Sequence, residues 1–309
     1  GGGSVGDPGT RIERVDGVRD RGVGPDVRVA RRAQVSMPYN RELDEMEGAA
    51  KSDSDLAAGT TGRGIGPTYE DKAGRRGIRI GDLLDPDTLR ERLEYVVPQK
   101  RALVEDVYDL EIGDDVDQAA FDVETLFETY RDFGERLGRE GMAINCGAFL
   151  DRRLEAGDEI MFEGAQGTSI DIDHGIYPYV TSSNPTAGGA AVGTGVGPTV
   201  VGGGEVIGIG KAYLSRVGTG PLPTELGSVD GQTPGVGGRP EDGDLATYIR
   251  DEGGEFGTVT GRPRRVGWLD MPMLRHAARA NGFTGLAINH IDVLAGLDEV
   301  RVGHSYILD

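Results

Sequence analysis

The sequence predicts an α/β fold in which a mainly parallel central sheet is flanked by helices. Short apolar stretches bounded by turn residues are typical of strands, and those at 206–209 and 286–288 are expected to be buried. Longer stretches with apolar residues at helical spacing lie elsewhere along the chain. Strands that alternate with helices favour a parallel sheet whose ligands bind at the strand ends.

Three helices are expected in the first half of the chain. Residues 41–57 predict a helix that is polar on most faces, and apolar residues recur at helical spacing over 88–110 and again over 119–140. Pro98 is expected to break or kink the second helix. The last two helices predict a helical subregion over 85–145, appended to the sheet of a single domain that spans 1–309.

The second half contains more irregular structure. Residues 159–162 predict a short strand that leads into a turn at 163–166. The stretch 227–244 is polar and rich in glycine and proline, which is typical of a long flexible loop. Cys146 follows a helix-like stretch and is expected to be a small buried residue.

The chain is strongly acidic, with 52 Asp and Glu against 33 Lys and Arg and a net charge of −19. This balance disfavours nucleic acid and anionic membranes as partners. It is typical of proteins from a salt-adapted cytoplasm, and an acidic protein from a low-salt organism is the alternative. Of the four lysines, Lys72 and Lys211 lie in the motif-bearing regions described below, which suggests roles that arginine cannot fill.

A cytoplasmic location is expected. No stretch of eighteen apolar residues occurs, and the first residues lack a basic region followed by an apolar one. Cys146 is the only cysteine, so no disulfide can form within the chain and a reducing compartment is compatible.

The run from Gly59 to Gly77 has the composition of a phosphate site. Glycines alternate with hydroxyl residues, so that backbone amides can approach an anion closely. Five cationic side chains lie in or directly after the run: Arg63, Lys72, Arg75, Arg76 and Arg79. A glycine-rich surface loop with solvated charges is the alternative.

Two further segments extend this pattern: 162–184, beginning Phe-Glu-Gly-Ala-Gln-Gly-Thr, and 257–268. Together with 59–77 they closely resemble the adenylosuccinate synthetase family, whose members use GTP to join aspartate to inosine monophosphate (IMP). The stretch from Gly64 to Arg75, Gly-Ile-Gly-Pro-x-Tyr-x-x-Lys-x-x-Arg, is similar to a signature pattern of that family. The resemblance runs in order along nearly the whole chain, and 227–244 is an insertion relative to it.

The resemblance implies a P-loop-NTPase-like synthetase fold that is incomplete at both ends, and a haloarchaeal-type member of the family. The family patterns Gly-Asp-Glu-Gly-Lys-Gly and Asn-Ala-Gly-His-Thr, which carry the catalytic aspartate and histidine, do not occur in these residues. The ligands of the Mg²⁺ cofactor are likewise expected in a region N-terminal to this sequence. No catalytic residue is therefore identified here, and the chain alone is expected to be inactive. Lys72 is a candidate for electrostatic support of the bound anion.

The resemblance assigns IMP to residues from three segments: Thr61, Arg75, Gln166, Thr181 and Arg262. Thr61 and Thr181 are expected to bind the phosphate and Arg262 the ribose. Gln166 is expected to contact the purine edge or neighbouring phosphoryl oxygens. Arg75 is expected to reach the phosphate from the partner subunit of a homodimer. Turn hydroxyls that cap the backbone are the alternative for the two threonines.

Aspartate is assigned to one loop: Thr258, Val259, Thr260, Gly261, Arg262, Pro263 and Arg264. Arginine binds carboxylates bidentately, which suits a substrate with two carboxylates. Pro263 and Val259 depart from the family pattern, which usually has arginine and threonine there. A solvated basic loop is the alternative interpretation.

GTP is assigned to Arg264 for the phosphates and to His290, Ile291 and Asp292 for the base. Asp292 can accept two hydrogen bonds from the N1–H and N2–H₂ groups of guanine. His290 replaces the usual lysine, and an ordinary turn histidine is the alternative. His174, in Asp171–Gly175, looks like part of a metal cluster but lacks a second ligand set, so it is interpreted as a loop-ordering group and no metal ligand is assigned.

Two other functions are alternatives to this interpretation of the sequence. One is a non-catalytic paralogue that binds purine nucleotides. The other is an unrelated P-loop GTPase, against which stands the absence of any Gly-x-x-x-x-Gly-Lys-[Ser/Thr] pattern.

The net charge of −19 leads to a prediction about salt. We expect the melting temperature to rise as KCl is raised toward about 2 M, because repulsion among surface carboxylates is screened as the Debye length falls to about 3 Å near 1 M. Thermal unfolding followed by circular dichroism across a KCl series checks this. A melting temperature that falls steadily over the same range contradicts a salt-adapted origin.

Overall fold

The computed structural model describes residues 5–51, 62–227, 243–257, 261 and 263–307. The strands within these residues are short: β1 (Val5–Gly6), β2 (Val29–Ala30), β3 (Gln34–Val35), β4 (Ala143–Ile144), β5 (Ile207–Lys211), β6 (Tyr213–Arg216), β7 (Arg265–Asp270), β8 (Gly285–Asn289) and β9 (Val302–Gly303).

The α-helices of the described residues are longer: α1 (Pro8–Arg19), α2 (Pro38–Lys51), α3 (Ile65–Ala73), α4 (Pro86–Ala102), α5 (Val123–Arg139), α6 (Cys146–Glu155), α7 (Gly188–Thr194), α8 (Pro198–Gly202), α9 (Gly243–Glu252) and α10 (Met271–Asn281). Short 3₁₀ and π turns complete the set: η1 (Asp82–Leu84), the π turn η2 (Leu103–Val107), η3 (Gln118–Phe121), η4 (Thr168–Ile170) and η6 (Asp292–Leu294).

Parallel pairing predominates, as the sequence predicts. β1 pairs with β3, β2 with β4, β5 with β8 and β7 with β9, all in parallel, while β6 and β7 are antiparallel. In the described residues these strands form four small sheets rather than one continuous central sheet. Most of these strands contain only two residues, which limits the β1–β3, β2–β4 and β7–β9 pairings to two residue pairs each.

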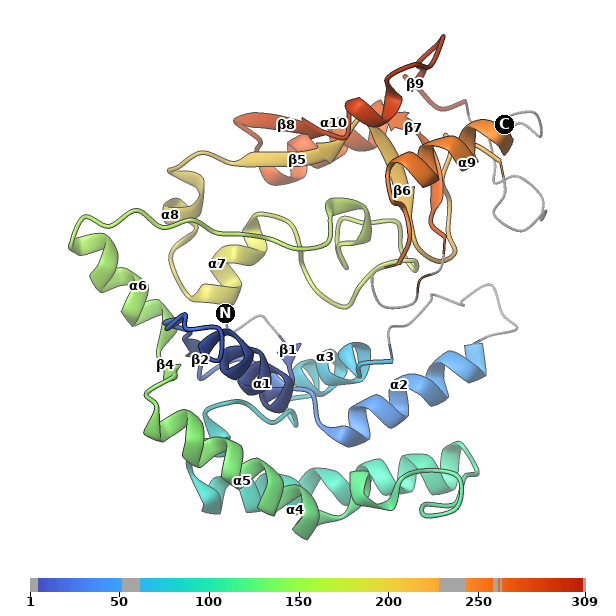
Figure 1. Ribbon diagram of the computed structural model, residues 1–309. Helices are drawn as coiled ribbons and strands as arrows, with labels where there is room; N and C mark the ends of the chain where they lie inside the picture. Colours follow the sequence, from blue (N-terminus) through green and yellow to red (C-terminus); the bar gives the residue numbers. More distant parts are fainter. Residues whose placement is uncertain (1–4, 52–61, 228–242, 258–260, 262, 308–309) are drawn as a thin grey trace.

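The elements lie in two groups joined by a middle segment (Figure 1). Helices α1 to α5 lie together in the lower part, while β5 to β9 lie with α9 and α10 in the upper part. The chain from α6 to α8 runs between them. Each group has its own hydrophobic core, one drawn from residues 15–143 and a smaller one from 213–294.

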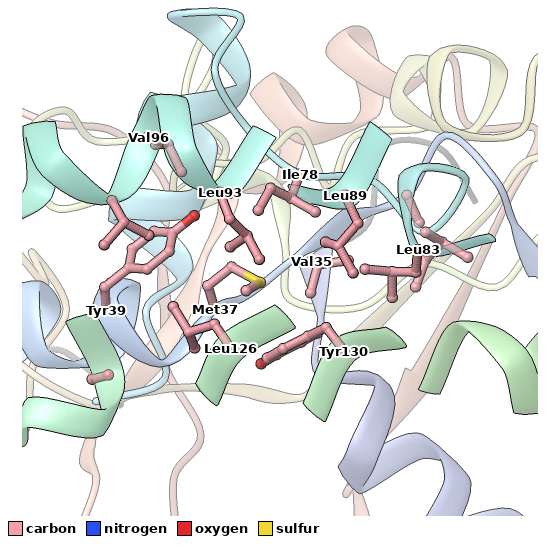
Figure 2. Packing of buried hydrophobic residues seen from close by; sticks show 14 of the residues in the cluster. Val35, Met37, Tyr39, Ile78, Leu83, Leu89, Leu93, Val96, Leu126 and Tyr130 are labelled. Carbon is pink, nitrogen blue, oxygen red and sulfur yellow. The ribbon is translucent and has the colours of Figure 1, made fainter. Parts of the chain in front are cut away.

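Helices α4 and α5 close over the larger core. Each begins at an aspartate whose side chain accepts a hydrogen bond from a first-turn amide, which stabilises a helix N-terminus. In α4, Leu89, Leu93 and Val96 recur at helical spacing and are fully buried. Figure 2 shows them facing Leu126 and Tyr130 of α5 across the core. The helical periodicity therefore marked the buried faces of α4 and α5, but the pattern over 88–110 was wrong at Val107, beyond α4, which is 68% exposed.

Helix α5 approaches η1 so closely that only glycine fits at the contact. A Cβ atom added at Gly134 would lie 1.7 Å from the carbonyl oxygen of Leu83. Any side chain here would force the two elements apart, so Gly134 fixes the distance between α5 and η1.

Helix α4 continues through Pro98 without interruption. Of the break or kink expected at Pro98, the break is therefore absent, and an irregularity appears at the π turn Leu103–Val107 that follows the helix. Val96 and Val97, which directly precede the proline, are buried in the larger core.

A buried carboxylate ties α2, α3 and α4 together. Asp71 of α3 is 1% exposed and accepts hydrogen bonds from Lys100 Nζ at 2.6 Å, Arg76 Nε at 2.7 Å and Asn40 Nδ2 at 2.9 Å. We call these four residues the Asp71 cluster. The carbonyl oxygen of Asp71 also accepts from the backbone amides of Arg76 and Gly77. The cluster therefore fixes the turn after α3, where Arg75 adopts a positive φ of 60°.

The strand expected over 159–162 is not formed. These residues have no regular secondary structure, and Met161 is 85% exposed. A strand is stabilised by hydrogen bonds to a neighbour, and none of the sheets in the described residues includes this segment.

The strands expected at 206–209 and 286–288 are present as β5 and β8, but they are not buried as predicted. Ile207 is 48% exposed, Ile209 70% and Leu286 44%. Within the described residues β5 and β8 pair only with each other, so these apolar side chains lack a covering layer. Cys146 is also only partly buried, because it lies in the first turn of α6.

The Asp71 cluster predicts a large effect for one lysine. Replacing Lys100 with methionine leaves a buried carboxylate short of one charge partner, and we expect the free energy of unfolding to fall by about 3 kcal/mol. Chemical denaturation measures this loss. Arg101→Met, at the next position of α4, removes an exposed pair with Glu105 and should cost less than about 1 kcal/mol. Equal losses in the two variants would contradict a special role for the buried pair.

Candidate functional site

A cavity of about 790 Å³ opens between the middle segment and the upper group of elements. It is lined by residues from five places in the chain: 166–176, 214–217, 221–223, Arg264 with Asp270 and Met273, and Tyr306. Gln166 and Arg264, which the sequence assigns to different ligands, therefore line one cavity. Mixed polar and apolar walls of this kind are typical of small-molecule sites.

Gln166 and Thr181 are connected through Ser183. The Ser183 hydroxyl donates to Gln166 Oε1 at 3.1 Å and lies 3.4 Å from Thr181 Oγ1. Gln166 adopts a positive φ of 71°, which turns the chain at the end of the glycine-rich segment. The structure thus brings together two of the residues predicted to bind IMP.

Helix α3 reaches the same group of hydroxyls. Tyr69 is hydrogen-bonded to Ser183; burial raises the pKa of the Tyr69 hydroxyl, and this bond acts in the opposite direction. Lys72, one turn along the helix, places Nζ 5.4 Å from the centre of the Tyr69 ring. Lys72 is therefore separated from the Gln166–Ser183–Thr181 group by a single side chain.

Asp171 organises the loop that carries Thr181. It is fully buried and accepts hydrogen bonds from the amides of Asp173, His174 and Thr186 and from the Thr186 hydroxyl. Burial acts to raise the pKa of Asp171, but these hydrogen bonds outweigh it and the pKa lies below its ordinary value. The sequence analysis interpreted His174 as the loop-ordering group of this stretch, whereas in the structure Asp171 accepts the hydrogen bonds that anchor the loop.

The backbone of His174 makes two contacts, one within this loop and one with α10. Its amide donates to Asp171, and its carbonyl oxygen lies 2.7 Å from His276 Nε2 of α10. The described part of the chain contains no group of three or more His, Cys, Asp or Glu side chains that could hold a metal ion. No helix within it is long and apolar enough to cross a bilayer.

The predicted aspartate loop is closed at its base by backbone pairing. Phe256 and Pro263 form an antiparallel bridge, and the Arg264 amide donates to the Glu255 carbonyl at 2.8 Å. Gly261 has a φ of 64° and donates from its amide to Gly257 at 2.7 Å. Four further residues assigned to substrates lie outside the described residues, as does Thr61: Thr258, Val259, Thr260 and Arg262.

Sequence reasoning missed Glu255, which lies directly before this loop. Glu255 is fully buried and binds Lys211 Nζ, the Tyr213 hydroxyl at 2.7 Å and Arg264 Nη1 at 3.0 Å. We call these residues the Glu255 cluster. Burial acts to raise the pKa of Glu255, but the hydrogen bonds from Lys211 and Tyr213 lower it below its ordinary value.

Two features of the sequence could have pointed to the Glu255 cluster. Lys211 is one of only four lysines. Lys211 and Tyr213 are two residues apart in an extended stretch, so their side chains share a face. Both features indicate that a hydrogen-bond acceptor lies opposite the side chains of Lys211 and Tyr213. They do not show which carboxylate is that acceptor.

The predicted guanine-reading residues follow β8. His290 has a positive φ of 60°, and its Nδ1 lies 3.3 Å from the Tyr213 hydroxyl. The two rings meet edge to face with centroids 6.0 Å apart. Ile291 and Asp292 are exposed at the start of η6, so the Asp292 carboxylate can be reached from solvent. The structure therefore connects His290 to the Glu255 cluster through Tyr213.

Arg75 lies apart from the cavity. It is exposed at the end of α3 and is not among the lining residues of the cavity. Its neighbour Arg76 is held in the Asp71 cluster, so the backbone at Arg75 is fixed while its side chain faces solvent.

Three comparisons relate the chain to known proteins. The family model described as adenylosuccinate synthetase matches residues 1–309. The adenylosuccinate synthetase of Natronomonas pharaonis is 79% identical over the whole chain, which covers 68% of that protein. The Halobacterium salinarum protein of the same name is 62% identical, again over the whole chain, and 66% of it is covered.

A solved structure agrees with these relatives. The fully ligated adenylosuccinate synthetase of Plasmodium falciparum superimposes with a TM-score of 0.80 at 30% identity, over 97% of this chain and 63% of that one. The chain thus spans about two thirds of the length of the proteins it matches. On this sequence match and this shared fold, the chain belongs to the adenylosuccinate synthetase family.

Proposed function

We propose that this chain carries the nucleotide-binding and aspartate-binding part of a GTP-dependent ligase that forms a C–N bond. The reaction joins L-aspartate to IMP and yields adenylosuccinate, GDP and phosphate, a step in the synthesis of AMP. One observation carries the proposal: in a chain of this family, Gln166 and Arg264 line the same cavity. Gln166 is assigned to IMP, and Arg264 is assigned to GTP and aspartate.

The IMP end of the site is proposed at the Gln166–Ser183–Thr181 group. Hydroxyls suit phosphate oxygens, and the Gln166 amide suits a purine edge with both donors and acceptors. Asp171 supports this assignment because it fixes the loop with five donors, including Asn184 Nδ2 at 3.2 Å. Lys72 adds a positive charge behind Tyr69 and would favour the bound dianion.

The GTP end is proposed at Arg264 and the segment from His290 to Asp292. The exposed Asp292 carboxylate can accept from both N–H groups of the guanine Watson–Crick edge, which selects guanine over adenine. Arg264 lies at the cavity wall and would bind phosphate oxygens or a substrate carboxylate. Thr258, Val259, Thr260 and Arg262, with Gly261 and Pro263, complete the proposed aspartate loop.

The proposed chemistry has two steps. A base removes the proton from N1 of IMP while O6 attacks the γ-phosphorus of GTP, and GDP leaves. The amino group of aspartate then attacks C6 and displaces phosphate. The residues of this chain are proposed to bind and orient the reactants, and no base or acid is assigned among them.

Mg²⁺ dependence accompanies the family assignment. The described side chains do not include a cluster suited to hold this ion, so no step is derived through it. A cytoplasmic reaction is also proposed, and the single cysteine, Cys146, is compatible with a reducing compartment.

The two ends of the site can be separated by mutation. We expect Asp292→Asn to weaken GDP binding roughly tenfold to a hundredfold, because the asparagine amide opposes the guanine donors and a charge-assisted hydrogen bond is worth about 1.5–3 kcal/mol. IMP binding should be unchanged. Thr181→Val should weaken IMP by a similar factor and leave GDP unchanged.

Isothermal titration calorimetry of the purified chain with GDP and with IMP measures both affinities. ADP serves as the base-specificity control and should bind much more weakly than GDP. If neither GDP nor IMP binds the unmodified chain, the proposed function is wrong. If each variant weakens both ligands equally, the assignment of separate ends is wrong.

We further propose that Arg75 completes the IMP site of the partner subunit in a homodimer. The exposed Arg75 side chain on a fixed backbone, away from the cavity of its own chain, supports this proposal. A two-fold dimer would then exchange one arginine in each direction.

Subunit mixing tests this exchange. Arg75→Ala and Thr181→Val should each abolish tight IMP binding. After random reassociation of the two variants, about a quarter of the sites should regain it, because half of the dimers are mixed and each mixed dimer has one intact site. Calorimetric stoichiometry of the mixture gives this fraction. No recovery, with dimers confirmed by light scattering, would show that Arg75 acts within its own chain.

A further inference from the structure

Glu255 occupies a position where three segments of the upper group meet. It follows α9, and its carboxylate faces Lys211 at the end of β5, Tyr213 at the start of β6 and Arg264, the residue before β7. Its backbone amide donates to the Arg250 carbonyl, and its own carbonyl accepts from the Arg264 amide. Glu255 and Arg264 are thus joined both through the backbone and through their side chains.

The carboxylate holds two cations that are only partly exposed. The side chains of Lys211 and Arg264 are 29% and 26% exposed, while that of Glu255 is 1% exposed. Without the negative charge, these two cations would repel each other across a site shielded from water. Lys211 Nζ has a second partner, Ser215 Oγ at 3.0 Å, whereas the described residues offer Arg264 Nη1 no other carboxylate.

Tyr213 carries this constraint to the segment after β8. Its hydroxyl, which is hydrogen-bonded to Glu255, lies 3.3 Å from His290 Nδ1. The Ala212 amide donates to the Asn289 carbonyl at 2.9 Å, so the backbones are also tied at this point. One carboxylate therefore contacts Arg264 directly and His290 through a single intervening side chain.

We propose that Glu255 is a positioning residue that fixes Arg264 relative to His290 and Asp292, and thereby sets the distance between the phosphate-binding and base-binding parts of the nucleotide site. The identity of the ligand rests on the function proposed above. The positioning itself rests on the Glu255 cluster.

A matched control is available in the same group of elements. Glu225 is also buried, and it binds Arg265, the residue next to Arg264, through Nε at 2.7 Å. Arg265 Nη1 donates to the carbonyl of Gly220 at 2.7 Å. Glu225→Gln therefore removes a comparable buried charge from a neighbouring arginine without touching Lys211, Tyr213 or His290.

The first experiment needs no ligand. In Glu255→Gln, amide hydrogen exchange should accelerate at least tenfold at Arg264 and at Ala212, the two amides whose hydrogen bonds connect the cluster to its neighbours. In Glu225→Gln both amides should exchange as in the unmodified chain. Unchanged exchange in Glu255→Gln, or equal acceleration in both variants, would overturn the positioning role.

The second experiment measures GDP and IMP affinity in the same variants. Glu255→Gln should weaken GDP at least tenfold and leave IMP within about twofold, whereas general destabilisation would weaken both. Glu225→Gln should change neither. Retained GDP affinity in Glu255→Gln overturns the proposal. Failure of the unmodified chain to bind GDP overturns the proposed function instead, and the exchange experiment then still decides the role of Glu255.

Discussion

A carboxylate taken out of water must be matched by donors, and this constraint organises every part of the molecule. Asp71 holds three helices of the lower group, Asp171 the middle loop, and Glu255 the base of the upper loop. Each is at most 1% exposed and accepts at least three hydrogen bonds from side chains or backbone amides. The chain has many acidic residues, and these three buried carboxylates fix how the neighbouring helices and loops are arranged.

The lysines illustrate how selective this arrangement is. Lys100 binds Asp71 and Lys211 binds Glu255, so two of the four lysines neutralise the buried carboxylates of the two cores. An ammonium group is compact and fits where a planar guanidinium would need more space. The sequence suggested a special role for Lys211, whereas Lys100 lay outside every motif and its role emerged only from the packing.

How much the sequence predicted depended on the range of the interaction. The helices α4 and α5 follow from local periodicity, and the predominance of parallel pairing follows from the alternation of strands with helices. The burial of Ile207 and Ile209 was predicted wrongly, because burial depends on which layers assemble over a strand. The motifs proposed Gln166, Thr181 and Arg264 as site residues, and Gln166 and Arg264 line one cavity. The motifs could not reveal Glu255, whose partners are 9 to 44 positions away along the chain.

The exposed isoleucines of β5 have a consequence for the choice of salt. Chloride salts act on this chain mainly by screening its negative charge. Sulfate and phosphate, being excluded from protein surfaces, also favour the removal of Ile207 and Ile209 from water. The exposed apolar side chains of β5 and β8 can be removed from water by contacts between molecules as well as within one molecule. Sulfate and phosphate therefore favour both kinds of contact. Two salts of equal ionic strength are therefore expected to differ for this protein, because sulfate or phosphate also favours contacts that cover the exposed side chains of β5.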